Sequence, residues 1–277
     1  MILPIISNSM TKTMIDKNQI SDDIAIHLKD VNIRYRMLQE RTTSLKEYAL
    51  NWIKGKNSYT YFWALRNINL KVEKGQSIGI IGDNGAGKST LLRVIARILY
   101  PTVGLANIWG SITPILELGA LFDPELTGRE NIYLNGAMFG YSRQTMNRKL
   151  DRLLDFAGIG DFIDSPLRTY SNGMIARLAF AIATDIEADI ILIDEVLAVG
   201  DHNFRQKCIS RMETFHDKGT TLVTVSHNLG LIAKLCSRVI WMEHGRIKAD
   251  GNPRDIIPLY EQSATEALFD KSQADTA

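Results

Sequence analysis

Short apolar runs alternate with amphipathic segments along this 277-residue chain. Residues 24–35 show the apolar–polar alternation of strands, and residues 64–80 contain two further strand-like runs. A further apolar run follows at 112–118, and strand-type runs rich in apolar residues follow at 189–193, 220–225 and 238–242. Such runs suit strands that are buried on both faces, and here they alternate with helical segments. The pattern therefore predicts an α/β fold with a parallel sheet covered by helices.

Two segments carry strong helix signals. Ser44 and Glu47 form a capping-box pair at the start of a predicted helix over residues 44–54. Its apolar face consists of Leu45, Tyr48, Ala49, Trp52 and Ile53. This face either packs on its own domain or serves a partner. A second capping box, at Thr127 and Glu130, begins a mainly helical region that is predicted to extend from 128 to about 184.

A glycine-rich loop lies between the strand-like run 77–81 and a helical run beginning at Leu91. It satisfies the pattern G-x-x-x-x-G-K-[ST] and consists of Gly82, Asp83, Asn84, Gly85, Ala86, Gly87, Lys88, Ser89 and Thr90. Backbone N–H groups of the turn and of the helix N-terminus converge there and suit an anion. We expect the loop to bind a nucleotide triphosphate, with Lys88 at the β- and γ-phosphates and the Ser89 hydroxyl on Mg²⁺.

Polar residues follow two of the predicted buried strands. Asp194 and Glu195 come directly after the run 190–193, and His227 comes shortly after the run 220–225. We expect these strand ends to emerge beside the phosphate loop. Asp194 would then hold Mg²⁺, and Glu195 would act as the general base for an attacking water. His227 would contact the γ-phosphate and position the water.

Ser171, Asn172, Gly173 and Met174 precede a predicted helix with a small-residue face. A serine N-cap, a glycine N–H and a positive helix end together form a second anion site. The same residues also fit an ordinary capped helix, and the pattern alone does not separate the two interpretations.

Composition narrows the class of protein. The formal net charge is +1, so no global field indicates nucleic acid or an anionic membrane as a partner. No apolar run reaches the length of a membrane span. Cys208 and Cys236 show neither metal-ligand spacing nor a disulfide framework. Residues 1–22 are polar after Ile6, and we expect them to form a mobile N-terminal extension.

In order and spacing, these motifs resemble the nucleotide-binding subunit of ATP-binding cassette (ABC) transporters, over about residues 24–255. The resemblance implies a P-loop NTPase with a RecA-like parallel-sheet core, an antiparallel β subdomain and an inserted α-helical subdomain. This domain would occupy residues 23–255, followed by a short helical tail at 256–277. ATP and Mg²⁺ are the implied cofactors.

The same resemblance implies a dimer in which two copies sandwich two ATP molecules. Ser171, Asn172, Gly173 and Asp201 would lie at the dimer interface, with Ser171 and Gly173 also touching nucleotide. Asn172 and Met174 depart from the usual Gly and Gln of this motif. The run Ala198-Val199-Gly200-Asp201 resembles the family's D-loop.

Two further positions follow from the resemblance. Tyr35 stands where the family's adenine-stacking aromatic is expected, and Trp63 is its rival because the segment between them blurs the alignment. Glu117 stands where the family usually has a Gln that senses Mg²⁺ and touches the membrane partner. A carboxylate there can ligate Mg²⁺ but adds a negative charge.

Four segments resemble the branch of the family that exports O-antigen, capsule and teichoic acid: 115–120, 124–132, 170–174 and 194–201. That branch also carries a gate helix, which residues 44–54 resemble. The implied function is an ATPase that powers glycan export through two copies of an ABC-2 type integral-membrane permease. It would act at the cytoplasmic face of the inner membrane. One alternative is a soluble ABC-type ATPase acting on ribosomes or DNA. Another is a non-hydrolytic nucleotide switch, and Glu195 argues against it.

Overall fold

The computed structural model describes residues 3–4, 23–38, 59–115, 119, 121–194 and 201–274. Its first sheet is antiparallel. Strand β2 (Ile24–Leu38) pairs with β3 (Tyr59–Glu73) on one edge and with β5 (Val103–Ile108) on the other, and β1 (Leu3–Pro4) pairs with β2 at Tyr35 and Arg36. Shifts of register along β2 break its alternation without ending the strand.

The second sheet has the order β10-β9-β4-β8-β7-β6. Its strands are β4 (Ser77–Ile81), β6 (Ile112–Ile115), β7 (Ile190–Asp194), β8 (Thr221–Val225), β9 (Arg238–Glu243) and β10 (Arg246–Gly251). All neighbouring pairs are parallel except β9–β10. The predicted parallel sheet is therefore confirmed, and the apolar runs of β4, β7 and β8 are its buried centre.

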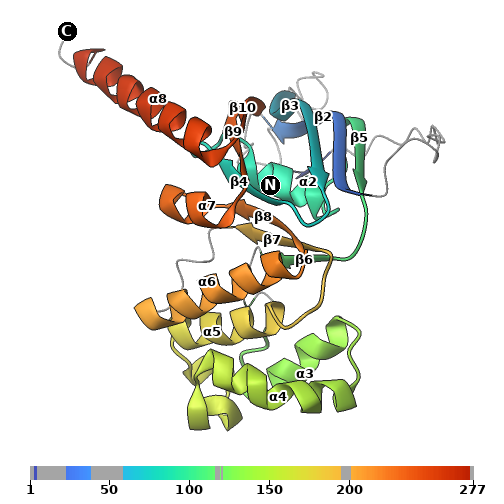
Figure 1. The fold of residues 1–277 in the computed structure, drawn as a ribbon. Helices are drawn as coiled ribbons and strands as arrows, with labels where there is room; N and C mark the ends of the chain where they lie inside the picture. The colour runs from blue at the N-terminus through green and yellow to red at the C-terminus, as the bar shows by residue number, and fades with distance from the viewer. Residues whose placement is uncertain are drawn as a thin grey trace, which may run out of the picture.

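Helices cover both faces of this parallel sheet (Figure 1). Helix α2 (Lys88–Ile95) lies between the two sheets, where its buried Leu91, Leu92 and Ile95 share a core with residues of β2, β3, β4 and β8. Helices α6 (His202–Asp217), α7 (Leu229–Leu235) and α8 (Pro253–Ala274) cover the opposite face and share a second core with it. The phosphate loop thus connects a fully buried strand, β4, to a helix whose apolar side is packed between the two sheets.

A helical subdomain lies below the sheets in Figure 1 and has its own core. It contains α3 (Gly128–Met138), α4 (Arg143–Ala157), two short 3₁₀ helices, η1 (Gly160–Asp164) and η2 (Leu167–Thr169), and α5 (Asn172–Ala183). The predicted capping box at Thr127 and Glu130 is present at the start of α3. These elements together span residues 128–183 of the chain.

Helix α8 begins three residues before the tail expected at 256 and extends to residue 274. Its buried Ile256 and Ile257 pack into the second core, and its far end leads away from the body of the molecule (Figure 1). The predicted helix at 44–54 lies outside the described residues.

Phe180 of α5 connects the helical subdomain to the core beneath the parallel sheet. It is fully buried, and its ring centroid lies 6.0 Å from those of both Phe156 and Phe204. We expect Phe180→Ala to lower the free energy of unfolding by about 3–5 kcal/mol, because the lost ring leaves a cavity. Denaturant unfolding measures this loss. Phe162 is 55% exposed, so Phe162→Ala is the matched control, with an expected loss below about 0.5 kcal/mol. Equal losses would contradict the assigned packing.

Candidate functional site

Two glycines shape the loop between β4 and α2. Gly82 has φ +142, and a Cβ built there would lie 2.2 Å from the carbonyl oxygen of Met242 in β9. Gly87 has φ +102, and its Cβ would lie 2.8 Å from the carbonyl oxygen of Ala64 in β3. Only glycine fits both positions, because the backbone of each approaches a neighbouring strand too closely for a side chain. The two sheets therefore hold the loop in one shape.

Lys88 is the first residue of α2 and is only 6% exposed. Its ammonium group donates hydrogen bonds to the carbonyl oxygens of Gly82, at 2.7 Å, and of Asp83, at 3.0 Å. These bonds keep the positive charge inside the loop, beside the N-terminus of α2. A phosphate group placed there meets this ammonium group and the positive end of the helix dipole.

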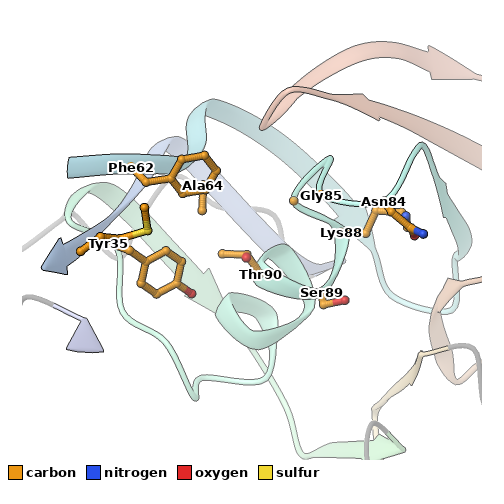
Figure 2. A pocket seen from close by; sticks show the side chains of 10 residues that line it. Tyr35, Phe62, Ala64, Asn84, Gly85, Lys88, Ser89 and Thr90 are labelled. Atoms are coloured by element: carbon orange, nitrogen blue, oxygen red, sulfur yellow. The ribbon is translucent and has the colours of Figure 1, made fainter. Parts of the chain in front are cut away.

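A pocket of about 440 Å³ adjoins the loop (Figure 2). Its lining comes from three elements and comprises Tyr35, Met37, Phe62, Ala64, Asn84, Gly85, Gly87, Lys88, Ser89 and Thr90. In Figure 2 the rings of Tyr35 and Phe62 lie at one end, and Asn84 and Lys88 lie at the other. An aromatic end and a phosphate-binding end match the two parts of a purine nucleotide.

The structure separates the two candidates for adenine stacking. Tyr35 lies opposite Phe62 in the β2–β3 register, and both line the pocket. Trp63, one residue further along β3, belongs to the other face of the strand, where the Arg34 guanidinium lies 5.4 Å from its ring. The geometry therefore favours Tyr35. Sequence reasoning missed Phe62 and Met37. Alternation from Tyr35 could have indicated Met37, but Phe62 requires the register between the two strands.

The polar strand ends meet at the edge of the sheet that carries the loop. Asp194 ends β7 and pairs with Val225, the last residue of β8, and β8 itself pairs with β4. His227 follows β8 and is exposed, and the next residue, Asn228, caps α7. The structure thus brings Asp194 and His227 to the edge from which the phosphate loop emerges. Glu195, Glu117 and residues 198–200 lie outside the described residues.

Asp201 is the N-cap of α6 and accepts a hydrogen bond from the backbone N–H of Phe204 at 2.8 Å. This bond, together with the charge of Arg177, lowers the pKa of Asp201. Arg177 also donates a hydrogen bond to the Asp201 carboxylate. Because Arg177 belongs to α5, this ion pair joins the start of α6 to the helix that Ser171 caps.

Residues 171–174, the predicted second anion site, lie at the start of α5 and away from the pocket. Ser171 is the N-cap and accepts from the backbone N–H of Met174 at 3.2 Å, as expected. Ser171 and Asn172 are exposed, and none of the three residues 171–173 is among those that line the pocket. A Cβ built on Gly173 would meet only the Ser171 hydroxyl, at 3.8 Å. Nothing that the described residues place around position 173 therefore requires a glycine.

The loop, the strand edge and the two-sheet core define a P-loop nucleotide-binding protein. A family model described as "ABC transporter" matches residues 65–198. The O-antigen export system ATP-binding protein RfbB of Klebsiella pneumoniae is 43% identical over 215 residues, which cover 78% of this chain and 86% of that protein. The chain belongs to the ABC transporter family.

A second relative differs more in length. The O-antigen export system ATP-binding protein RfbB of Myxococcus xanthus is 42% identical over 248 residues, which cover 88% of this chain and 57% of that protein. The chain thus spans little more than half the length of this relative. Among solved structures, the ATP-binding cassette MJ0796, in a dimeric post-hydrolysis state bound to ADP and Pi, matches with a TM-score of 0.67 at 24% identity. The match covers 82% of this chain and 98% of that one. This likeness confirms the predicted fold.

The two aromatic candidates make a testable pair. We expect Tyr35→Ala to weaken ATP binding by about 1–3 kcal/mol, the usual loss when a stacking ring is removed. Trp63→Ala should change the affinity by less than about 0.5 kcal/mol, because its ring lies on the other face of β3. Titration calorimetry with MgATP measures both. A larger loss for the Trp63 variant, with both variants folded by circular dichroism, would reverse the assignment.

Proposed function

We propose that the chain is the ATP-hydrolysing subunit of an exporter for a surface polysaccharide such as O-antigen. The observation that carries the nucleotide part is the pocket in which an aromatic end faces a lysine-bearing phosphate loop. The polysaccharide part rests on the two relatives named for O-antigen export, each more than 40% identical to this chain.

Mg²⁺ would enter this site together with the nucleotide. Ser89 lines the pocket, and Asp194 ends the strand two places from β4. A hydroxyl and a carboxylate suit Mg²⁺, which usually takes one or two protein groups besides phosphate oxygens and water. Within the described residues no group of three or more His, Cys, Asp or Glu side chains could hold a metal ion. Glu117 is the further ligand that we propose.

Hydrolysis needs a base and a way to neutralise charge on the γ-phosphate. Glu195 follows Asp194 directly, and we assign it as the base that takes a proton from the attacking water. Lys88 and His227 would stabilise the negative charge of the phosphoryl group during transfer.

The second half of each catalytic site would come from another copy of the chain. Ser171, Asn172 and Gly173 form an exposed helix N-terminus outside the pocket of their own chain. Among the described residues only the Ser171 hydroxyl lies within 4 Å of a Cβ built on Gly173, which leaves the start of α5, with its first backbone N–H groups, open to a phosphate. In the proposed dimer these N–H groups and the Ser171 hydroxyl bind the γ-phosphate held by the other copy, with Asp201 at the same interface.

The membrane step would belong to a partner. In the part of the chain that the structure describes, no helix has both the length and the apolar character needed to cross a bilayer. We propose that two copies of an ABC-2 type permease carry the glycan and hold this ATPase at the cytoplasmic face of the inner membrane. No observation favours a role on ribosomes or DNA.

Glu195→Gln tests the catalytic assignment. We expect ATPase activity to fall by about 100-fold or more, because the amide cannot accept the proton of the attacking water. Bound ATP should then hold the variant as a dimer, which size-exclusion chromatography with light scattering detects. In a strain that lacks the gene, this variant should fail to restore the surface glycan, whereas the wild-type gene restores it.

The exposed Glu187 provides the matched control. Glu187→Gln should keep wild-type turnover and restore the glycan. Normal turnover by the Glu195 variant would remove the base assignment. An unchanged set of surface glycans in the deletion strain would remove the proposed cargo.

Gly173→Ala tests the proposed second copy. The free energy of unfolding should change by less than about 0.5 kcal/mol, because the new methyl group meets no close neighbour among the residues that the structure describes. ATPase activity should nevertheless fall at least about tenfold, because the methyl group would obstruct a bound phosphate. Gly230 holds the matching second position of α7, so Gly230→Ala serves as the control. Wild-type activity of the Gly173 variant would contradict the composite site.

A further inference from the structure

Tyr260 of helix α8 contacts the phosphate loop. The Tyr260 hydroxyl donates a hydrogen bond to Oδ1 of Asp83, at 3.0 Å, across 177 positions of sequence. The Tyr260 ring also stands edge-on to Trp241 of β9, with 5.5 Å between centroids and 75° between planes. One residue of the C-terminal helix therefore contacts both the loop and the strand beside it.

Trp241 holds Tyr260 in place relative to the loop. It pairs with Ile81, the residue immediately before Gly82, in the β4–β9 register. The next residue of β9, Met242, presents the carbonyl oxygen that excludes a side chain at Gly82. Trp241 is buried, and Ile256 and Ile257 anchor the first turns of α8 in the same core. The hydroxyl of Tyr260 thus reaches Asp83 from a rigid base.

Asp83 contributes to the loop with two different groups. Its backbone carbonyl accepts from the Lys88 ammonium group, which supports the loop's shape. Its side chain is an exposed carboxylate in the loop that we expect to bind a triphosphate. A negative charge that turned toward the phosphates would oppose their binding. Burial and the neighbouring Asp83 raise the pKa of Tyr260 to about 12, so the hydroxyl remains a proton donor at neutral pH.

We propose that Tyr260 is a positioning residue for the phosphate loop: it holds the Asp83 carboxylate on the α8 side and so favours the binding of MgATP. The inference rests on the proposed binding of MgATP at this loop. It gives α8 a function beyond covering the sheet. The far end of this helix leads away from the body of the molecule (Figure 1). Because Tyr260 belongs to α8, a displacement of the helix would break the bond to Asp83 and weaken nucleotide binding.

Tyr260→Phe isolates the hydroxyl, because the ring and its contact with Trp241 remain. We expect the Kd for MgATP, measured by titration calorimetry, to rise about 3- to 10-fold, the effect of losing one hydrogen bond to a partly solvated carboxylate. The KM of the ATPase should rise in parallel, while kcat stays within about twofold, because the hydroxyl acts on binding and not on the transferred phosphoryl group.

The Asp83→Asn background distinguishes positioning from packing. With no negative charge at residue 83, Tyr260→Phe should change the Kd by less than about twofold, since the two residues act as one unit. Tyr133→Phe is the control: it removes a tyrosine hydroxyl bonded to Asn147 in the helical subdomain and should leave the Kd unchanged.

Two results would overturn the inference while the proposed function stands. One is an unchanged Kd and KM for Tyr260→Phe in the wild-type background. The other is an equal loss in both backgrounds, which would assign Tyr260 a purely structural role. If the wild-type chain itself fails to bind MgATP, the proposed function fails first, so the two failures are distinguishable.

Discussion

The buried ammonium group of Lys88 is the interaction on which the rest of this structure depends. A charge in this position needs partners, and the carbonyl oxygens of Gly82 and Asp83 supply them. Backbone carbonyl groups of β9 and β3 closely approach Gly82 and Gly87. These contacts hold the loop in the shape in which its own carbonyl groups point inward. The two sheets therefore keep a positive charge and a helix N-terminus aimed at one site before any nucleotide arrives.

The two sheets also bring the candidate site residues together from distant parts of the chain. The parallel sheet brings the ends of β4, β7 and β8 to one edge, and with them the phosphate loop, Asp194 and His227. The antiparallel sheet adds Tyr35 and Phe62 at the opposite end of the pocket. Ser171, at the start of α5, is exposed and does not line this pocket, and in the proposed dimer it would complete the site of another copy.

Local rules predicted part of this arrangement from the sequence. The phosphate loop, the buried strands and the capping box at Thr127 each depend on residues within a few positions of one another, and all are present. These features can be predicted from the sequence because hydrophobic periodicity and the start and stop signals of helices depend only on residues within one helix, strand or turn.

The register between strands that are distant in sequence could not be predicted in this way. Phe62 enters the pocket because it lies opposite Tyr35 in the β2–β3 register. Tyr260 reaches Asp83 because its ring packs on Trp241, which lies beside Ile81 in the β4–β9 register. No spacing in the sequence encodes either contact. The role of Glu195 came from its place directly after a buried strand, and that of Glu117 came from the resemblance to a family. Both roles remain proposals because the two residues lie outside the described part of the chain.

The claim that two copies complete each catalytic site is tested most directly by dilution. Specific ATPase activity should be measured across a concentration series, with the mass of the particles followed in parallel by light scattering or mass photometry. The account predicts that activity per chain falls as the population becomes monomeric. Constant activity per chain in samples shown to contain only monomers would contradict it.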